Sequence, residues 1–242
     1  SNIRGDRWPL LIGVEAIDEL HVFEESADAI LIGAALPLAD IGRLWRRAPA
    51  VIHEWLALFA SPPIRNRASL GGGLATGLSV GDAAPLPAAL HPRLHVAGPG
   101  NRRTMDIASF FTGYRTTVLR PDEMLTAIEI PKPLPQAERF YKIPKGSVDD
   151  ISTVAAAMAL DRETDGTVGR SRFAFGGVAA TPLRATAAEE AVAGHTWDAA
   201  AVARVQQVLD RTLRPMSDHR GSAAYRLEVS KSLVEKFWWE TR

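Results

Sequence analysis

Hydrophobic positions in the first part of the chain follow a strand-like and then a helix-like spacing. Short apolar runs at residues 10–20 and 29–33 predict buried strands. Apolar residues that recur every three to four positions across residues 41–45 and 51–59 predict helices interrupted at Pro49, with basic side chains on the exposed face. The first part of the chain is therefore expected to combine strands with helices.

Shorter elements are predicted between residues 94 and 131. Residues 94–98 predict a strand, residues 101–103 a turn and residues 107–114 a short helix. A further strand is predicted at residues 124–130, where Pro131 stops it because proline cannot donate a ladder hydrogen bond.

A proline-rich segment at residues 131–137 is the predicted linker between two domains. Three prolines in this segment exclude both a helix interior and a central strand. Beyond it, period-two segments predict strands and period-3.6 segments predict helices. The strands are expected at residues 139–143, 153–161 and 170–175, and the helices at residues 186–193, 199–213 and 223–239. We therefore predict a two-domain α+β protein, with an α/β domain at residues 1–134 and a domain of a small antiparallel sheet with helices at residues 138–242.

Composition and charge narrow the classes of function. The 28 basic and 28 acidic side chains cancel, so no overall field favours nucleic acid or an anionic membrane. Apolar runs all fall well short of the ~20 residues that cross a bilayer. We expect a soluble, cytoplasmic protein whose partners are small molecules or other proteins.

Cysteine is absent, which excludes a disulfide, a thiolate metal site and an iron–sulfur cluster from this chain. The N-terminal residues 1–7 contain neither a signal-peptide-like run nor an initiating methionine, so we expect them to follow a processing boundary or a cut in a longer protein.

Residues 69–82 form the most informative segment. The helical pattern ends at the prolines of residues 61–63, and five glycines with three hydroxyls and one carboxylate then occur within fourteen residues. Such a segment suits a tight loop whose backbone N–H groups face a phosphate, but a plain turn between core elements explains it equally well. The glycines do not match G-x-G-x-x-G, and no acidic residue at a plausible strand end follows about 20 residues on, so the sequence argues against a Rossmann NAD site.

Several longer motifs resemble one known family, the flavin domain of molybdenum hydroxylases such as xanthine dehydrogenase and the flavoprotein medium subunit of carbon monoxide dehydrogenase. The first domain carries Ile64-Arg65-Asn66-x-Ala68-Ser69-Leu70-Gly71-Gly72, and also Phe110-Phe111-x-Gly113-Tyr114-Arg115. The second carries Tyr141-Lys142 with Asp149-Asp150-Ile151, then Gly176-Gly177-Val178-Ala179, then Ser217-Asp218-x-Arg220-Gly221-Ser222-Ala223-x-Tyr225-Arg226. The resemblance covers nearly the whole chain.

The resemblance implies FAD held between subdomains, with electrons passing from iron–sulfur clusters to NAD or another acceptor. The clusters and the molybdopterin are expected on a partner iron–sulfur domain and a partner molybdopterin-binding subunit. By position in the matched motifs, the expected FAD contacts are Phe59 near the flavin, Ser69, Gly72 and Gly73 at the phosphates and ribitol, Asp82 on a hydroxyl, Met124 and Leu125 at the adenine or ring region, and Lys142 at the flavin edge.

Three departures from the family pattern bear on this site. Gly73 stands where the family has asparagine, and Gly146 stands where it has an arginine. The family's earlier glycine loop, which forms half of the phosphate cradle, has no match before Leu10, so the chain is expected to start after it. We therefore expect the FAD site to be recognisable but weak or empty in this chain.

Other candidate residues have structural interpretations. Asp218 and Arg220 are expected to tie down a helix start rather than to react. His91 and His95 have helical spacing, but Pro92 argues against a helix through them, so no metal site is expected. Asp149 and Asp150 could orient an acceptor nucleotide or simply cap a strand, and Trp238 and Trp239 are expected in the core or at a subunit contact. No hydrolase triad can be assembled from these residues.

Three hypotheses remain after the sequence analysis. The first is an electron-transferring flavoprotein module, and the second is a non-catalytic fragment or assembly subunit that no longer holds FAD. The third, a flavin oxidoreductase of another class such as a peptidoglycan-precursor reductase, is disfavoured by the motif that ends at Arg226.

Overall fold

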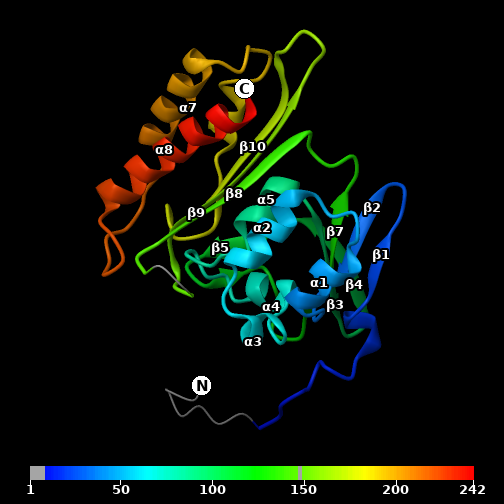
Figure 1. The fold of residues 1–242 in the computed structure, drawn as a ribbon. Coiled ribbons are helices and arrows are strands. Elements are labelled where there is room, and N and C mark those ends of the chain that lie inside the picture. Colours follow the sequence, from blue (N-terminus) through cyan, green and yellow to red (C-terminus); the bar gives the residue numbers. More distant parts are fainter. Residues whose placement is uncertain (1–8, 147–148) are drawn as a thin grey trace.

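The computed structural model describes residues 9–146 and 149–242, which form two larger sheets with their helices and one two-stranded sheet (Figure 1). The sequence prediction for residues 1–7 lies outside these ranges. The first sheet is antiparallel and has the strand order β1-β2-β7-β3-β4. Its strands are β1 (Phe23–Glu25), β2 (Ala29–Gly33), β3 (Arg93–Gly98), β4 (Asn101–Asp106) and β7 (Met124–Pro131).

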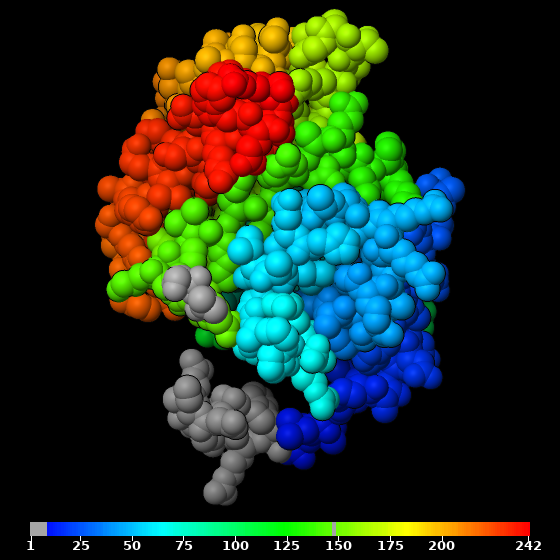
Figure 2. All heavy atoms as spheres, viewed as in Figure 1, coloured from blue at the N-terminus to red at the C-terminus, as the bar shows by residue number. Residues whose placement is uncertain are grey.

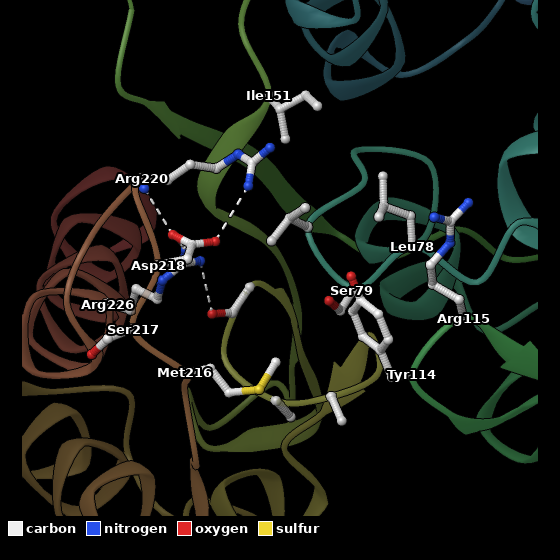
Figure 3. Close-up of a pocket in the computed structure, with 14 residues that line it drawn as sticks. Leu78, Ser79, Tyr114, Arg115, Ile151, Met216, Ser217, Asp218, Arg220 and Arg226 are labelled. Carbon is white, nitrogen blue, oxygen red and sulfur yellow. Dashed lines mark hydrogen bonds and ion pairs between the residues drawn. The ribbon is translucent and has the colours of Figure 1, made fainter. Parts of the chain in front are cut away.

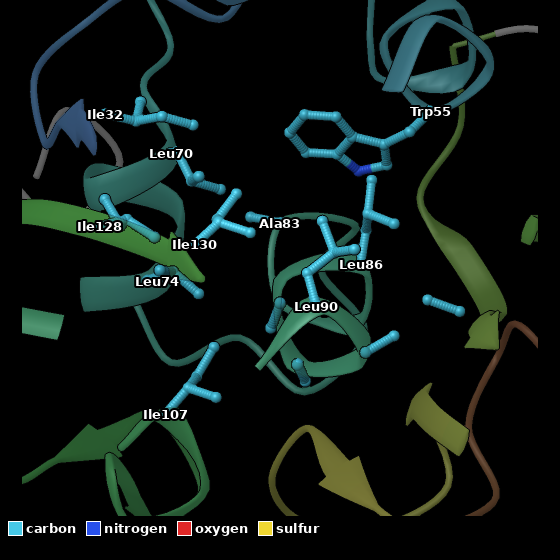
Figure 4. Close-up of a cluster of buried hydrophobic side chains, with 14 of the residues drawn as sticks. Ile32, Trp55, Leu70, Leu74, Ala83, Leu86, Leu90, Ile107, Ile128 and Ile130 are labelled. Atoms are coloured by element: carbon cyan, nitrogen blue, oxygen red, sulfur yellow. The ribbon is translucent and has the colours of Figure 1, made fainter. Parts of the chain in front are cut away.

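Helices cover one face of this sheet and bury the core of the first domain. They are α1 (Leu38–Leu44), α2 (Ala50–Leu58), α4 (Leu70–Ala75) and α5 (Pro85–Leu90); the short α3 (Pro62–Arg65) has no buried residue and lies against α1. Figure 4 shows the core between them, where Ile128 and Ile130 of β7 meet Leu74 of α4 and Leu86 of α5. Burial of these large apolar side chains supplies most of the stability of this layer.

The second sheet is also antiparallel and has the order β11-β10-β9-β8. Its strands are β8 (Ala137–Pro144), β9 (Ser152–Arg162), β10 (Val168–Gly176) and β11 (Leu183–Arg184), followed by α6 (Thr186–Glu190), α7 (Ala199–Thr212) and α8 (Ala223–Thr241). In Figure 1, α7 and α8 lie on the side of this sheet away from the first domain. The predicted α+β fold class is thus confirmed.

Strand β9 joins the two cores because it is buried on both faces. Side chains alternate along a strand, so Ala155, Ala157 and Ala159 point into the first core while Val154 and Met158 point into the second. The small alanine side chains let α5 approach the sheet closely. The first and second layers therefore pack into one continuous body in the space-filling view (Figure 2).

The sequence predicted most second-domain elements to within a few residues, but several first-domain predictions were wrong. Residues 10–20 form no strand; Leu11 is 80% exposed, and the apolar run ends in a short 3₁₀ helix, Asp18–Leu20. Residues 101–103 belong to β4 rather than to a turn. The expected helix at residues 107–114 is a 3₁₀ turn, Ile107–Ser109, followed by the β5 strand (Phe111–Gly113), which pairs with β6 (Thr116–Thr117).

Candidate functional site

The segment 69–82 lines three neighbouring hollows within the described part of the chain. Its first half borders a hollow of about 260 Å³, together with Met124 and Leu125 of β7. Its second half borders a hollow of about 240 Å³ with Phe59 and Lys142, and a larger one of about 610 Å³. The tertiary structure therefore groups seven of the eight predicted FAD contacts at two hollows.

The glycine-rich start of this segment forms a short helix, so the predicted tight loop at residues 71–73 was wrong. Ser69 caps α4 by accepting a hydrogen bond from Gly72 N–H at 3.1 Å. The N–H of Gly71 donates to Ala34 C=O and that of Gly73 to Ser69 C=O, both at 3.1 Å. These N–H groups are thus bonded inside the protein rather than turned toward an anion.

Two of the glycines are needed for close packing. A Cβ on Gly71 would lie 2.5 Å from the carbonyl oxygen of Ala34, and one on Gly73 would lie 2.5 Å from Cβ of Ala83. Gly72 differs, because a Cβ there would meet only Ser69 Oγ, at 3.2 Å, and the residue is exposed toward the first hollow. The structure places Gly73 outside the residues that line the hollows, and its predicted FAD contact stays a prediction.

A nearly buried ion pair borders the second hollow. Lys142 Nζ of β8 donates to Asp82 Oδ2 at 2.7 Å, and the two side chains are only 6% and 11% exposed. The same ammonium donates to Leu58 C=O at 3.0 Å, and the indole N–H of Trp55 donates to Asp82 C=O at 2.8 Å. The second sheet and the segment 69–82 are therefore joined at the wall of this hollow.

The hydroxyl of Ser152 completes this cluster by donating to Asp82 Oδ1. Sequence reasoning missed Ser152, which begins β9 directly after the quoted Asp149-Asp150-Ile151 motif. The only sequence signal was its place beside that motif, because Ser152 and Asp82 lie 70 positions apart.

Phe59 lies at the C-terminal end of α2, where the backbone is held in a specific conformation. Ala60 has φ of 44°, a left-handed conformation that costs free energy for a residue with a Cβ. Arg65 Nη1 donates to the carbonyl oxygens of Phe59, at 2.9 Å, and of Ala60. The ring of Trp55 meets that of Phe59 edge to face at 5.4 Å, so both backbone and ring of Phe59 are fixed beside the hollow.

The largest hollow lies between the two domains and shares Leu78, Val80 and Ile151 with the second hollow. Figure 3 shows Tyr114 and Arg115 on one side and Arg220 and Asp218 on the other. Tyr114 is 59% exposed. The ring of Tyr114 and the guanidinium groups of Arg115 and Arg220 thus line a space that adjoins the second hollow.

The C-terminal motif holds the wall of this hollow together. Arg226 is 2% exposed; its Nη2 donates to Asp218 Oδ1 at 2.6 Å, and its Nη1 donates to Gly177 C=O at 3.2 Å. Burial alone raises the pKa of Asp218, but hydrogen bonds from Arg220 N–H and Arg226 outweigh it and lower the pKa to about 2. Asp218 therefore ties the loop before α8 to Arg226 of that helix, as the sequence predicted for it.

The remaining candidates occupy separate places. His91 pairs with Asp106 at 3.0 Å and His95 with Glu129 at 2.9 Å, and residues 9–146 and 149–242 contain no group of three or more side chains suited to a metal ion. Asp150 caps its own turn by accepting the Gly146 and Ile151 N–H groups, at 2.6 and 2.8 Å. Trp239 is 52% exposed and packs on Trp238 and Arg242.

The residues of the first two hollows fit a flavin dinucleotide. Gly72 has no Cβ, so it leaves room beside the Ser69 hydroxyl that a larger residue would fill. At the second hollow, a fixed aromatic ring and an ammonium offer apolar contact and a charged donor, which are the groups that orient a redox cofactor.

The comparisons with known proteins identify the family of the chain. Residues 2–133 match the FAD binding domain in molybdopterin dehydrogenase, and residues 139–241 match the CO dehydrogenase flavoprotein C-terminal domain. Because the first match covers more than half of the chain, the chain belongs to this family of FAD-binding domains. The predicted resemblance is confirmed, and its relatives are oxidoreductases.

Individual relatives cover the chain almost completely. It is 33% identical to xanthine dehydrogenase of Calliphora vicina over 95% of its length, but spans 18% of that protein. It is 27% identical to the carbon monoxide dehydrogenase medium chain of Hydrogenophaga pseudoflava, covering 93% of this chain and 79% of that one. A solved carbon monoxide dehydrogenase from the same organism, lacking the molybdenum–pyranopterin moiety of its cofactor, matches with a TM-score of 0.85 and 29% identity over 92% of this chain and 78% of that one.

These relatives are parts of larger enzymes that contain further subunits or domains. The matches favour the flavoprotein module over the fragment hypothesis. None of the helices in the described ranges is long and apolar enough to cross a membrane.

Proposed function

We propose that the chain binds FAD and relays electrons within a xanthine dehydrogenase-type molybdenum hydroxylase. Electrons arrive from iron–sulfur clusters on a partner segment and leave to NAD or another acceptor, while a separate molybdopterin-binding subunit carries out the hydroxylation. FAD supplies the redox chemistry, and the protein supplies binding, orientation and electrostatics. The observation that carries this proposal is the Asp82–Lys142 pair at the wall of a hollow that also contains Phe59.

The candidate residues of the two hollows are assigned to different parts of FAD. We assign the phosphate and ribityl part of FAD to Ser69 and Gly72, and the adenine or adjoining region to Met124 and Leu125. The flavin ring belongs at the second hollow, where Phe59 offers an aromatic surface and Lys142 an N–H donor. Asp82 holds Lys142 in place, and Gly73 contributes by letting α4 pack on Ala83.

The largest hollow is the proposed entry for the electron acceptor. It adjoins the second hollow through Leu78, Val80 and Ile151, so an acceptor there would lie beside the flavin. Arg115 and Arg220 suit the phosphates of a nicotinamide dinucleotide, because a guanidinium matches phosphate geometry, and Tyr114 offers a ring for stacking. We place the complex in the cytoplasm, which cell fractionation tests directly.

A flavin titration tests the central proposal. FAD fluorescence should be quenched as the purified chain is added, and Lys142→Gln should weaken the binding. Addition of NADH under anaerobic conditions should bleach the bound flavin, and Tyr114→Ala should raise the NADH concentration that is needed. A chain that neither quenches FAD nor acquires a flavin absorbance band would overturn the proposal.

The fragment hypothesis makes a different prediction for the same titration. If half of a phosphate cradle is encoded upstream of Ser1, a longer chain that includes it should bind FAD much more tightly than this one. Equal affinity of the two chains would show that residues 1–242 suffice. Binding by the longer chain alone would establish residues 1–242 as an incomplete site.

A further inference from the structure

Ser152 presents a hydroxyl in an unusual setting at the start of β9. The residue is fully buried, at 0% exposure, and its Oγ donates to Asp82 Oδ1 across the contact between the two domains. Ser152 itself is not among the residues that line the second hollow. Its hydroxyl therefore acts on the hollow only through Asp82.

The Ser152 hydroxyl belongs to a small hydrogen-bond network that also contains Asp82 and Lys142. Asp82 has two carboxylate oxygens, of which Oδ1 accepts from Ser152 and Oδ2 accepts from Lys142. The Lys142 ammonium has three N–H bonds, and two of them are directed at Asp82 and at Leu58 C=O. Within the described residues the third N–H has no protein partner, and Lys142 lines the second hollow.

Removal of the hydroxyl would leave Asp82 Oδ1 without its donor in a site that water hardly reaches. A buried carboxylate oxygen that loses a donor is costly, so the carboxylate would turn until both oxygens share the Lys142 ammonium. The ammonium would then be drawn away from the hollow and toward Asp82.

We propose that Ser152 is a positioning residue for the cofactor site: its hydroxyl fixes the Asp82 carboxylate so that Lys142 keeps one N–H available to the flavin. This inference rests on the proposed FAD-binding function. It adds Ser152, a residue of the second domain, to the site. The contact between the domains would then help to set the position of the Lys142 charge near the flavin.

The test compares two substitutions of nearly equal shape, Ser152→Thr and Ser152→Val. Threonine keeps the hydroxyl and valine lacks it, and both side chains are β-branched and suit a strand. We expect Ser152→Val to weaken FAD binding about tenfold, which corresponds to the loss of one hydrogen bond to a charged group. Ser152→Thr should bind FAD within about twofold of the wild type, on the same reasoning.

The midpoint potential of the bound flavin provides a readout that a merely structural role would not move. A cation near the ring stabilises the added negative charge of the reduced flavin. Withdrawal of the ammonium should therefore make the potential of the Ser152→Val protein more negative, while that of Ser152→Thr stays at the wild-type value.

Ser230 offers a matched control, because its hydroxyl is also at 0% exposure but donates within α8, to Arg226 C=O at 2.7 Å. Ser152→Ala and Ser230→Ala remove equally buried hydroxyls, and only the former should change FAD affinity and potential. If the bulkier substitutions do not fold, this alanine pair carries the test.

The outcomes separate this inference from the function on which it rests. Tight FAD binding and an unchanged potential in Ser152→Val, with a wild-type chain that binds FAD, would overturn the role of Ser152 and leave the proposed function standing. Absence of FAD binding by the wild-type chain would overturn the proposed function and this inference together. Loss of affinity in both Ser152→Val and Ser152→Thr would indicate a packing role and count against the hydroxyl.

Discussion

Lys142 Nζ lies 2.7 Å from Asp82 Oδ2, and this bond joins a strand of the second sheet to the segment that follows α4. Its two residues are 60 positions apart in the sequence, and each contributes a charge that is almost fully buried. Such a pair is maintained by precise geometry, because neither charge can recover its hydration if the other is removed.

Lys142→Gln is therefore expected to destabilise the fold by about 3 kcal/mol, since it leaves Asp82 buried without its counter-ion. The free energy of unfolding from urea titration measures this effect. Lys132→Gln is the control, because Lys132 pairs with Glu25 at a more exposed site, where an ion pair contributes about 0–1 kcal/mol. Equal losses in the two variants would contradict the importance assigned to burial.

Gly71 and Gly72 are neighbours with opposite expected responses to alanine. Gly71→Ala would force a Cβ against the backbone of Ala34 and should cost about 1–3 kcal/mol of stability. Gly72→Ala should leave stability unchanged or raise it by up to about 1 kcal/mol, because alanine is the better helix former.

The same pair separates folding from cofactor binding. The methyl group of Gly72→Ala would occupy part of the first hollow, so FAD affinity should fall although the protein remains stable. Thermal unfolding and FAD titration of both variants check this. Full FAD affinity in Gly72→Ala would remove Gly72 from the proposed contacts.

Protonation of His91 at mildly acidic pH is expected to lower the stability of the folded protein. Its Nδ1 lies 3.1 Å from Arg184 Nη1, and its Nε2 lies 3.0 Å from Asp106. Burial, which outweighs the opposing effect of Asp106, lowers the pKa of His91 below 6.5, and Arg172 and Arg184 add to the lowering. The unfolded chain therefore binds this proton more readily, and the stability contribution is fully present above pH 6.5 and is lost as the pH falls through the lower folded-state pKa.

His91→Asn should flatten this pH dependence, since asparagine does not titrate and tolerates the φ of 56° at this position. Urea unfolding of the wild type and the variant across mildly acidic pH measures the difference. His53→Asn, at an exposed histidine, is the control. A wild-type-like slope in His91→Asn would refute the assignment.

Asp218 is expected to contribute to a second loss of stability at more acidic pH. Its folded-state pKa of about 2 lies below the ordinary 3.8, so its contribution is present above pH 3.8 and is lost as the pH falls toward 2. Asp218→Asn should be less stable than the wild type near neutral pH and should lose less stability on acidification. Circular dichroism during acid titration checks this, with the exposed Asp122→Asn as the control. Parallel acid curves for Asp218→Asn and the wild type would contradict it.

Long helices were predictable from the sequence because the spacing of apolar residues within the segment is enough to identify them. The apolar stripe of α7 and the capping residues Asp198 and Ser222 define two helices whose starts were predicted correctly. Residues 10–20 have a strand-like composition, but a strand forms only where another strand offers hydrogen-bond partners, and none pairs with them among the described residues. Periodicity within the segment could not reveal that.

The sequence by itself determined the family, the α+β class and the candidate FAD contacts, because its motifs and periodicities are local properties. Only the tertiary structure decided that Gly71 and Gly73 of α4 serve close packing, that Asp82 bonds to Lys142, and that Ser152 joins them. Those contacts connect residues distant in the chain. Their formation depends on how the two sheets pack across β9, and this packing is a property of the whole fold.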